Sequence, residues 1–427
     1  MSIFILVLFL VLMLLGIPVA ISLGAASVAA ILIYDVSTIA SAVKLMYSAM
    51  NSFTMVAVPL FFLAGVLMEK GGVAQKIFDF CEDVVGWISG GLGHVNILTS
   101  ILFAGMSGSS VADVASIGAL CSNAMIRSGY PAPYAWGTTL ASSMLATVIP
   151  PSILMVVAAS VAQVSMGKAL FAGIIPGVVL GFIMMLYNYF YCKKNKIGHV
   201  IPFNGKKLRK SFLSSLPALL VPVILLGGMY TGYFTSTEAA AICVLYTLIV
   251  SMFIYRKLKV RDLPEIFMQV AKNTGTVLFV AITAKPAGQL FTLDGFPAQV
   301  SKAITGISSN AVVVMLLIFL LLTVIGMFMD ATAAIYIFMP ILLPTATSVG
   351  IDPLFFVVFM VIALEFGLIT PPVGVCLYAA INVSGLSMEK ITKGLMPWLI
   401  VLFIGLLLFI LFPQLVTVPI GIIFPAT

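Results

Sequence analysis

The sequence is poor in charge and in the side chains that most often carry out chemistry. Asp, Glu, Lys and Arg make up only 8% of its 427 residues, whereas soluble domains carry roughly 25%. It has two histidines and five cysteines without paired spacing, so neither a transition-metal cluster nor a disulfide framework is indicated. No nucleophile stands near a base, and the sequence predicts that the protein is not an enzyme.

What the chain has instead is apolar sequence, which makes up 62% of its residues. Runs of about 20 apolar residues, long enough to cross a bilayer, recur from end to end. The start of the chain enters such a run with no basic segment before it, so we expect a first transmembrane helix and not a removed signal peptide. The fold class is therefore an all-α polytopic membrane protein. Its net charge of +7 is a topology signal and does not indicate a nucleic-acid partner.

Two parts of the chain resemble each other at an offset of 221 residues. Gly105-Met106 and Gly326-Met327 each precede a prolyl pair by forty-five positions, and these pairs are Pro150-Pro151 and Pro371-Pro372. A small polar run follows each Gly-Met. Repeated helix-breaking glycines and prolines beside polar residues, in so apolar a chain, are typical of a transporter. In such proteins interrupted helices line a binding site near the middle of the membrane.

The apolar runs and their breaks divide the chain into four parts. We expect an N-terminal helix and connection over 1–49, a first repeat over 50–192, a basic loop with two scaffold helices over 193–262, and a second repeat over 263–427. Each repeat should contain a polar-tipped re-entrant hairpin and a Pro-Pro-interrupted helix. The predicted helices and helix pairs cover 3–33, 50–68, 73–88, 95–127, 134–163, 168–192, 212–231, 237–255, 270–292, 311–348, 353–383 and 394–412.

The basic residues give the orientation. Seven lie in the loop Lys193–Lys210 and four more at 256–261, and two helices separate these clusters, so the positive-inside rule puts both in the cytoplasm. When the sides are alternated across the predicted helices in both directions from these clusters, seventeen basic residues fall in the cytoplasm and three outside. The N-terminus is then predicted to be cytoplasmic. The amphipathic stretch Gln75–Trp87 should then lie against the membrane lipids on the same face. The two hairpins open to opposite sides, so the repeats are predicted to be inverted.

The polar residues of the repeats predict binding sites. Hydroxyls and unwound backbone carbonyls are ligands for monovalent cations, and each proline frees a carbonyl one helical turn back. The expected cation ligands are Ser107, Ser109, Ser110, Gly326, Asp330, Thr332, Gly367, Thr370 and Gly374. The expected substrate-binding residues are Ser110, Thr147, Pro150, Ser152, Pro371 and Pro372. For a single copy, a prolyl pair that merely kinks a packed helix would explain the pattern equally well.

Four ionisable residues are predicted at membrane depth, where charge is costly and usually functional. Asp113 and Asp330 begin the second arms of the hairpins, where a carboxylate either caps the helix or binds a cation. Glu365 either pairs with a base or carries a proton. Lys285 either pairs with Glu365 or extends toward the interface.

Together these motifs resemble the large membrane subunit of TRAP transporters, of the DctM-like, unfused type. The resemblance is carried by 105–113, 148–152, 326–332 and 367–374, and extends to Gly16-Ile-Pro-Val-Ala20. It implies an elevator-type, sodium-driven importer of organic acids, such as C4-dicarboxylates or sialic acid, in a bacterial inner membrane. It also implies Na⁺ as coupling ion and two partners, a small four-helix membrane subunit and a periplasmic binding protein. Glu365 departs from the pattern, since a neutral residue is expected there.

Two other functions remain open at this stage. A stand-alone sodium- or proton-coupled symporter of similar design would need no binding protein, and Glu365 with Lys285 keeps proton coupling open. A membrane-embedded enzyme acting on lipids is disfavoured by the few acidic, His and Cys side chains. The sequence does not identify the organic acid.

Overall fold

A computed structural model of the chain describes residues 1–51, 53–198 and 201–424, and within these the side chains of 53, 54 and 104–107 fall outside the description. Every regular element in these ranges is a helix. Seven described helices are long and apolar enough to cross a membrane, or up to nine if two bent pairs each count as one. The prediction of an all-α polytopic membrane protein is confirmed.

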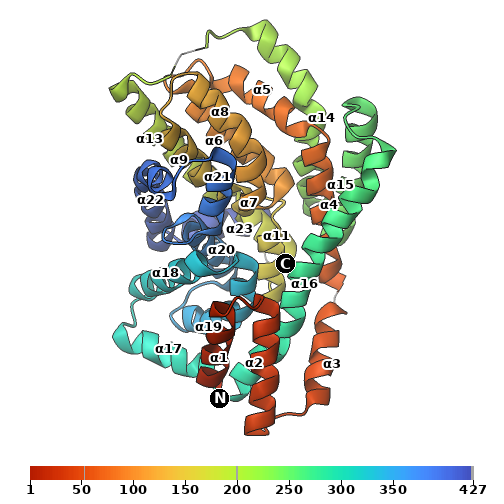
Figure 1. The fold of residues 1–427 in the computed structure, drawn as a ribbon, viewed down its shortest axis with the longest axis vertical. Helices are drawn as coiled ribbons and strands as arrows, with labels where there is room; N and C mark the ends of the chain where they lie inside the picture. The colour runs from red at the N-terminus through yellow and green to blue at the C-terminus, as the bar shows by residue number, and fades with distance from the viewer. Residues whose placement is uncertain (52, 199–200, 425–427) are drawn as a thin grey trace.

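The N-terminal segment differs from the single helix expected over 3–33. Gly16 has a φ of +85° and Pro18 follows it, so the chain turns back and two short helices pack against each other. Both lie at the lower end of the molecule in Figure 1, beside the N-terminus. The helices of this part are α1 (Ser2–Leu14), α2 (Val19–Tyr34), α3 (Ile39–Met50), η1 (Phe53–Val56), α4 (Ala57–Lys70) and α5 (Val73–Val85).

In the segment predicted as the first repeat, the helices break at the two predicted places. The hairpin breaks after Ser107, and the helix expected over 134–163 breaks between Val148 and Ile153. The elements are α6 (Gly91–Ser107), α7 (Ser110–Asp113), the π-helical turn η2 (Val114–Gly118), α8 (Ala119–Arg127), α9 (Ala132–Ser143), α10 (Leu145–Val148), α11 (Ile153–Val161), α12 (Met166–Ala172) and α13 (Ile174–Asn195).

Two long helices separate the repeats and pack against each other and against α4 and α5. They are α14 (Gly205–Tyr230) and α15 (Ser236–Ile249), followed by η3 (Val250–Ile254) and η4 (Val260–Asp262). An ion pair links this part to α5, because Lys207 Nζ lies 3.1 Å from Glu82 and 3.0 Å from Asp83.

The segment predicted as the second repeat also has two breaks at the predicted places. Its hairpin breaks at Met329-Asp330, and its interrupted helix breaks between Ile369 and Val375. The elements are α16 (Leu263–Leu293), α17 (Phe296–Ile307), α18 (Ala311–Phe328), α19 (Ala331–Ser348), α20 (Pro353–Ile369), α21 (Val375–Ser384), α22 (Met388–Leu411) and α23 (Gln414–Ile423). In Figure 1, α6 and α8 lie in the upper half of the molecule and α17 and α19 in the lower half.

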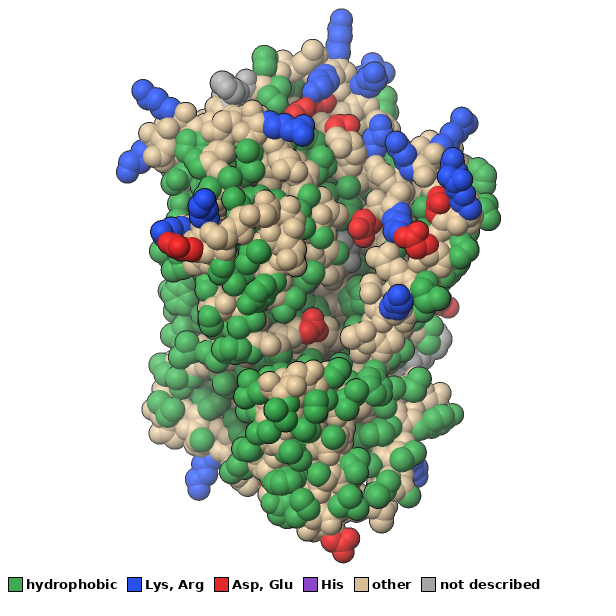
Figure 2. All heavy atoms as spheres, viewed as in Figure 1, with side chains coloured by type: hydrophobic (Ala, Val, Ile, Leu, Met, Phe, Trp, Pro, Cys, Tyr) green, Lys and Arg blue, Asp and Glu red, His purple; other side chains and the backbone are tan. Residues whose placement is uncertain are grey.

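Helix α20 forms the centre of the fold. Every residue from Phe355 to Ile369 is buried, as expected for a helix that is apolar on all sides and surrounded by others. It contacts α10, α11, α18 and α19, and therefore elements of both repeats. Charged side chains gather at the upper end of the molecule, and apolar side chains cover most of the face below it (Figure 2).

Candidate functional site

The two breaks at the proline pairs, residues 149–152 and 370–374, are called the first and second prolyl loops. The tip of the first hairpin contacts the first prolyl loop. Gly108 has a φ of +59°, and a Cβ there would meet the Ile153 nitrogen at 3.2 Å and the Pro151 carbonyl oxygen at 3.3 Å. Ser109 caps the second arm by accepting from the Ala112 amide at 3.4 Å. Ser107, a predicted ligand, lies among the residues whose side chains are outside the description.

The first prolyl loop is closed by its own hydroxyls. Ser152 caps α11, since its hydroxyl accepts from the Met155 amide at 3.1 Å and donates to the Thr147 carbonyl. The Thr147 hydroxyl donates to the Met144 carbonyl at 2.9 Å. Both side chains are buried. The bond between Pro150 and Pro151 is cis, as is that between Pro371 and Pro372.

The second hairpin meets the second prolyl loop through backbone. The Gly374 amide donates to the Met327 carbonyl at 2.9 Å, and α18 touches α20 where Gly326 faces Gly367. At the tip, Asp330 caps α19 by accepting from the Thr332 amide at 2.8 Å, as the capping alternative predicts. The Thr370 hydroxyl donates to the Phe366 carbonyl at 2.5 Å, which leaves the lone pairs of its oxygen available to a ligand.

The contact between Gly326 and Gly367 leads to a stability prediction. A Cβ on residue 367 would lie 2.6 Å from the Thr323 carbonyl oxygen. This oxygen belongs to the backbone of α18, so the two helices would have to move apart to make room. Overpacking of this kind costs about 1–3 kcal/mol. We therefore expect Gly367→Ala to lower the melting temperature of the purified protein by several degrees. Gly275→Ala is the matched control, because a Cβ there meets nothing within 4 Å; equal melting temperatures for both variants would show that the helices do not pack this closely.

Glu365 joins the two repeats, which the sequence did not predict. It is buried in α20, and the hydroxyls of Ser110 and Thr147, both from the first repeat, lie within hydrogen-bonding reach of its carboxyl group. The Cys376 thiol, from the second repeat, donates to the Ser110 hydroxyl at 3.3 Å. One carboxyl oxygen of Glu365 has no hydrogen-bond partner. The offset of 221 residues relates each residue of one repeat to its equivalent in the other. The contacts of Glu365 and Cys376 join residues that are not equivalent, so the offset could not predict them.

Asp113 is not a helix cap, so that alternative is wrong. Ser109 holds the cap position, and Asp113 instead lies fully buried between the arms of the hairpin and α9. Its carboxylate accepts from the Ser100 hydroxyl at 3.0 Å, and a hydrogen-bonded chain runs on to Ser142 and Asn96. The network satisfies one oxygen of Asp113, while the other has no partner.

Lys285 does not pair with Glu365. Glu365 is buried among Ser110, Thr147 and the middle of α20, whereas Lys285 is exposed on α16 and lines an open cavity. Among the described residues, no carboxylate forms an ion pair with Lys285. The pairing that kept proton coupling open is therefore absent from this structure.

The arrangement supplies uncharged oxygens, carboxylates and two helix N-termini in one buried region. Helix α11 begins directly after the first prolyl loop, and α19 begins directly after the tip of the second hairpin. The N-termini of helices favour the anionic groups of a ligand. Hydroxyls and unwound carbonyls beside them suit a monovalent cation. An arrangement of this kind suits an anion bound beside cations. Of the predicted residues, Ser110, Thr147, Ser152, Asp330 and Thr370 lie at or beside the two tips and loops.

The chain resembles known transport proteins over nearly its whole length. Residues 6–415 match the family described as the tripartite ATP-independent periplasmic transporter, DctM component. The sialic acid TRAP transporter large permease protein SiaM of Vibrio cholerae is 36% identical, covering 93% of each chain. The C4-dicarboxylate TRAP transporter large permease protein DctM of Pseudomonas aeruginosa is 34% identical, covering 91% of each. The YdaH transporter of Alcanivorax borkumensis, at 14% identity, shares the fold with a TM-score of 0.58, covering 89% of this chain and 88% of that one.

Proposed function

The chain belongs to the family of DctM components of tripartite ATP-independent periplasmic (TRAP) transporters, and from this membership we propose that it is the translocating subunit of a sodium-coupled importer of organic acids. The relatives are permease subunits, so the expectation of a transport component and not an enzyme is confirmed. Relatives are named for sialic acid, C4-dicarboxylates, isethionate and 2,3-diketo-L-gulonate. The substrate class we propose is a small organic anion.

One observation supports sodium coupling above the others. Both hairpin tips and both prolyl loops meet in one region, where Ser110, Thr147 and Glu365 from different repeats come within hydrogen-bonding reach. If cations occupy the hydroxyl and carbonyl ligands there, their charge offsets that of the anionic substrate beside them. Binding of one then raises the affinity for the other by the same factor, which is how a gradient of the ion drives the acid.

The arrangement of helices also supports an elevator mechanism. The hairpins and interrupted helices form a compact unit around α20, while α14 and α15 pack with α4 and α5 beside it. A rigid unit of this kind can slide past a fixed scaffold and present one site to either face. In this proposal, hairpin α6–α8 opens toward the cytoplasm and hairpin α18–α19 toward the periplasm.

The orientation we propose differs from the sequence expectation at the N-terminus. The basic side chains gather at the upper end of the molecule, and the N-terminus lies at the lower end (Figure 1). Because α1 and α2 turn back on each other, this segment does not cross the membrane once as a single helix would. With the basic end in the cytoplasm, the first residues lie on the periplasmic side, and the other assignments from the charge count are unchanged.

Reconstitution tests the function directly. We expect proteoliposomes containing this chain and the small membrane subunit to take up labelled acid only with an inward sodium gradient and a loaded periplasmic binding protein. Collapsing the sodium gradient while keeping a proton gradient is the control, and it should stop uptake. Uptake by this chain alone, or uptake driven by protons alone, would contradict the proposal and indicate a stand-alone or proton-coupled symporter.

A further inference from the structure

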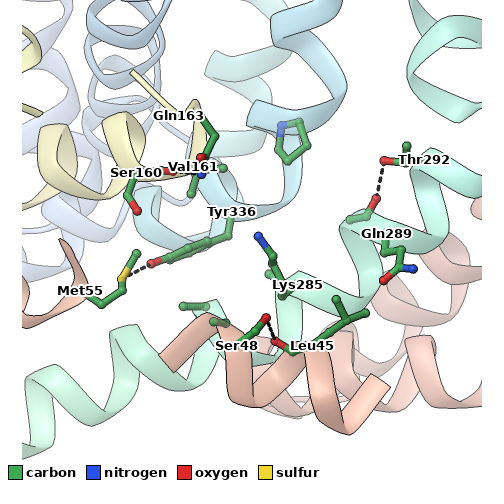
Figure 3. A pocket seen from close by; sticks show the side chains of 15 residues that line it. Leu45, Ser48, Met55, Ser160, Val161, Gln163, Lys285, Gln289, Thr292 and Tyr336 are labelled. Atoms are coloured by element: carbon green, nitrogen blue, oxygen red, sulfur yellow. Dashed lines mark hydrogen bonds between the residues drawn. The ribbon is translucent and has the colours of Figure 1, made fainter. Parts of the chain in front are cut away.

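One cavity in the described part of the chain lies outside the region of the tips and loops. Its volume is about 500 Å³, and it is open on one side. Helices α3 and α16 form one wall, and α11 and α19 form the other (Figure 3). One wall thus comes from the N-terminal part and α16, and the other from one helix of each predicted repeat, α11 and α19. The cavity lies in the half of the molecule away from the basic end.

The cavity is connected to the site through two helices. Tyr336 lies six residues after Asp330 on α19, and Ser160 lies eight after Ser152 on α11, which is about 9 Å and 12 Å along the helix axes. Both helices start at a break; α11 ends beside the cavity, and α19 passes it with Tyr336 and Pro340. A solute in the cavity is thus about two helical turns from the second hairpin tip and from the first prolyl loop.

Lys285 is the only charged side chain that lines this cavity among the described residues. Its amino group points into the open space, on the side of Tyr336 (Figure 3). It lies eight residues before the end of α16, about 12 Å along the axis, and so within the span. A lysine at this depth without an ion pair is a functional-site candidate, since unpaired charge in a membrane span is costly.

We propose that Lys285 receives the carboxylate of the transported acid in this cavity, before the acid moves to the site between the tips. This inference rests on the proposed import function. An ammonium group attracts a carboxylate over several ångströms in a partly enclosed space, where water screens less than in bulk. The cavity lies in the half of the molecule away from the basic end, which the proposed orientation places toward the periplasm.

The remaining polar groups indicate which acid fits. One lysine can neutralise one carboxylate, and no second cation lines the described cavity. The other polar lining groups are hydroxyls and amides, from Ser48, Ser160, Gln163, Gln289, Thr292 and Tyr336. These groups suit the hydroxyl and amide substituents of a larger acid. The cavity therefore favours a hydroxylated monocarboxylate, such as a sugar acid, over a short dicarboxylate, whose second carboxylate would have no cation.

Lys285→Gln in the reconstituted complex is the decisive variant, tested with labelled sugar acids and labelled C4-dicarboxylates at saturating sodium. We expect initial uptake of the sugar acid to fall at least tenfold, whereas Lys285→Arg, which keeps the charge, should retain most of it. Lys272→Gln is the matched control, because Lys272 is exposed on the same helix but does not line the cavity. Melting temperatures of all variants should equal that of the wild type.

The outcomes separate the two proposals. If the wild type and Lys272→Gln import no acid with sodium and the binding protein, the proposed function is wrong. If they import and Lys285→Gln imports equally fast, the role of Lys285 is wrong and the function stands. Import of dicarboxylates but of no sugar acid by the wild type would overturn the substrate preference.

Discussion

Glu365→Leu is expected to abolish sodium-driven uptake, whereas Glu365→Gln should retain it within about threefold, the range expected when one hydrogen bond is exchanged for another of similar strength. The carboxyl group lies buried within reach of the Ser110 and Thr147 hydroxyls. A glutamine has the same length and offers an oxygen and an amide to the same two groups. A leucine removes both and leaves buried hydroxyls at the junction of the repeats without this partner.

The pair of variants also decides between coupling ions. If Glu365 carried the coupling proton, glutamine could not replace it, and uptake would be lost in both variants. Initial rates in proteoliposomes with a sodium gradient measure the difference. Glu389→Gln is the control, because Glu389 is an exposed glutamate paired with Lys393 at 2.6 Å and should behave as wild type. Loss of uptake in Glu365→Gln with normal folding would contradict sodium as sole coupling ion.

The sequence predicted the breaks in the helices well, because breaks have local causes. Prolines at 150–151 and 371–372 cannot continue a helix, and the polar residues at the tips are costly inside a lipid-facing helix. The observed breaks at 149–152 and 370–374 fall at these positions. The turn at Gly16-Ile17-Pro18 has the same local signal, and the prediction of one helix over 3–33 was wrong because a long apolar run was given more weight than its breakers.

The contacts between elements could not be predicted in this way. The role of Asp113 depends on Ser100, which comes from the other arm of the hairpin, while the cap position belongs to a serine four residues earlier. Glu365 meets Ser110 and Thr147 only because α20 passes between elements of the first repeat. Internal similarity relates equivalent positions of the two repeats and carries no information on contacts between non-equivalent ones.

Ser110→Ala and Thr370→Ala are each expected to raise the sodium concentration for half-maximal uptake about tenfold, which corresponds to about 1.4 kcal/mol of lost cation binding. Each hydroxyl stands at a break of its repeat. The Ser110 hydroxyl accepts from the Cys376 thiol at 3.3 Å and is nearly buried, and the Thr370 hydroxyl donates to its own helix. In both, the oxygen keeps a lone pair free for a cation, and alanine removes it with little change in volume.

A loss of sodium affinity must be separated from a loss of folded protein. Ser116→Ala is the matched control for Ser110, because Ser116 lies on the same hairpin arm and its hydroxyl donates to the Ala112 carbonyl at 2.7 Å. Thr347→Ala serves for Thr370 in the same way, since the Thr347 hydroxyl also donates to carbonyls of its own helix. Both controls should keep the wild-type sodium dependence. If Ser110→Ala and Thr370→Ala lowered the maximal rate without moving the sodium midpoint, the hydroxyls would be structural, and the cations would be held by backbone carbonyls alone.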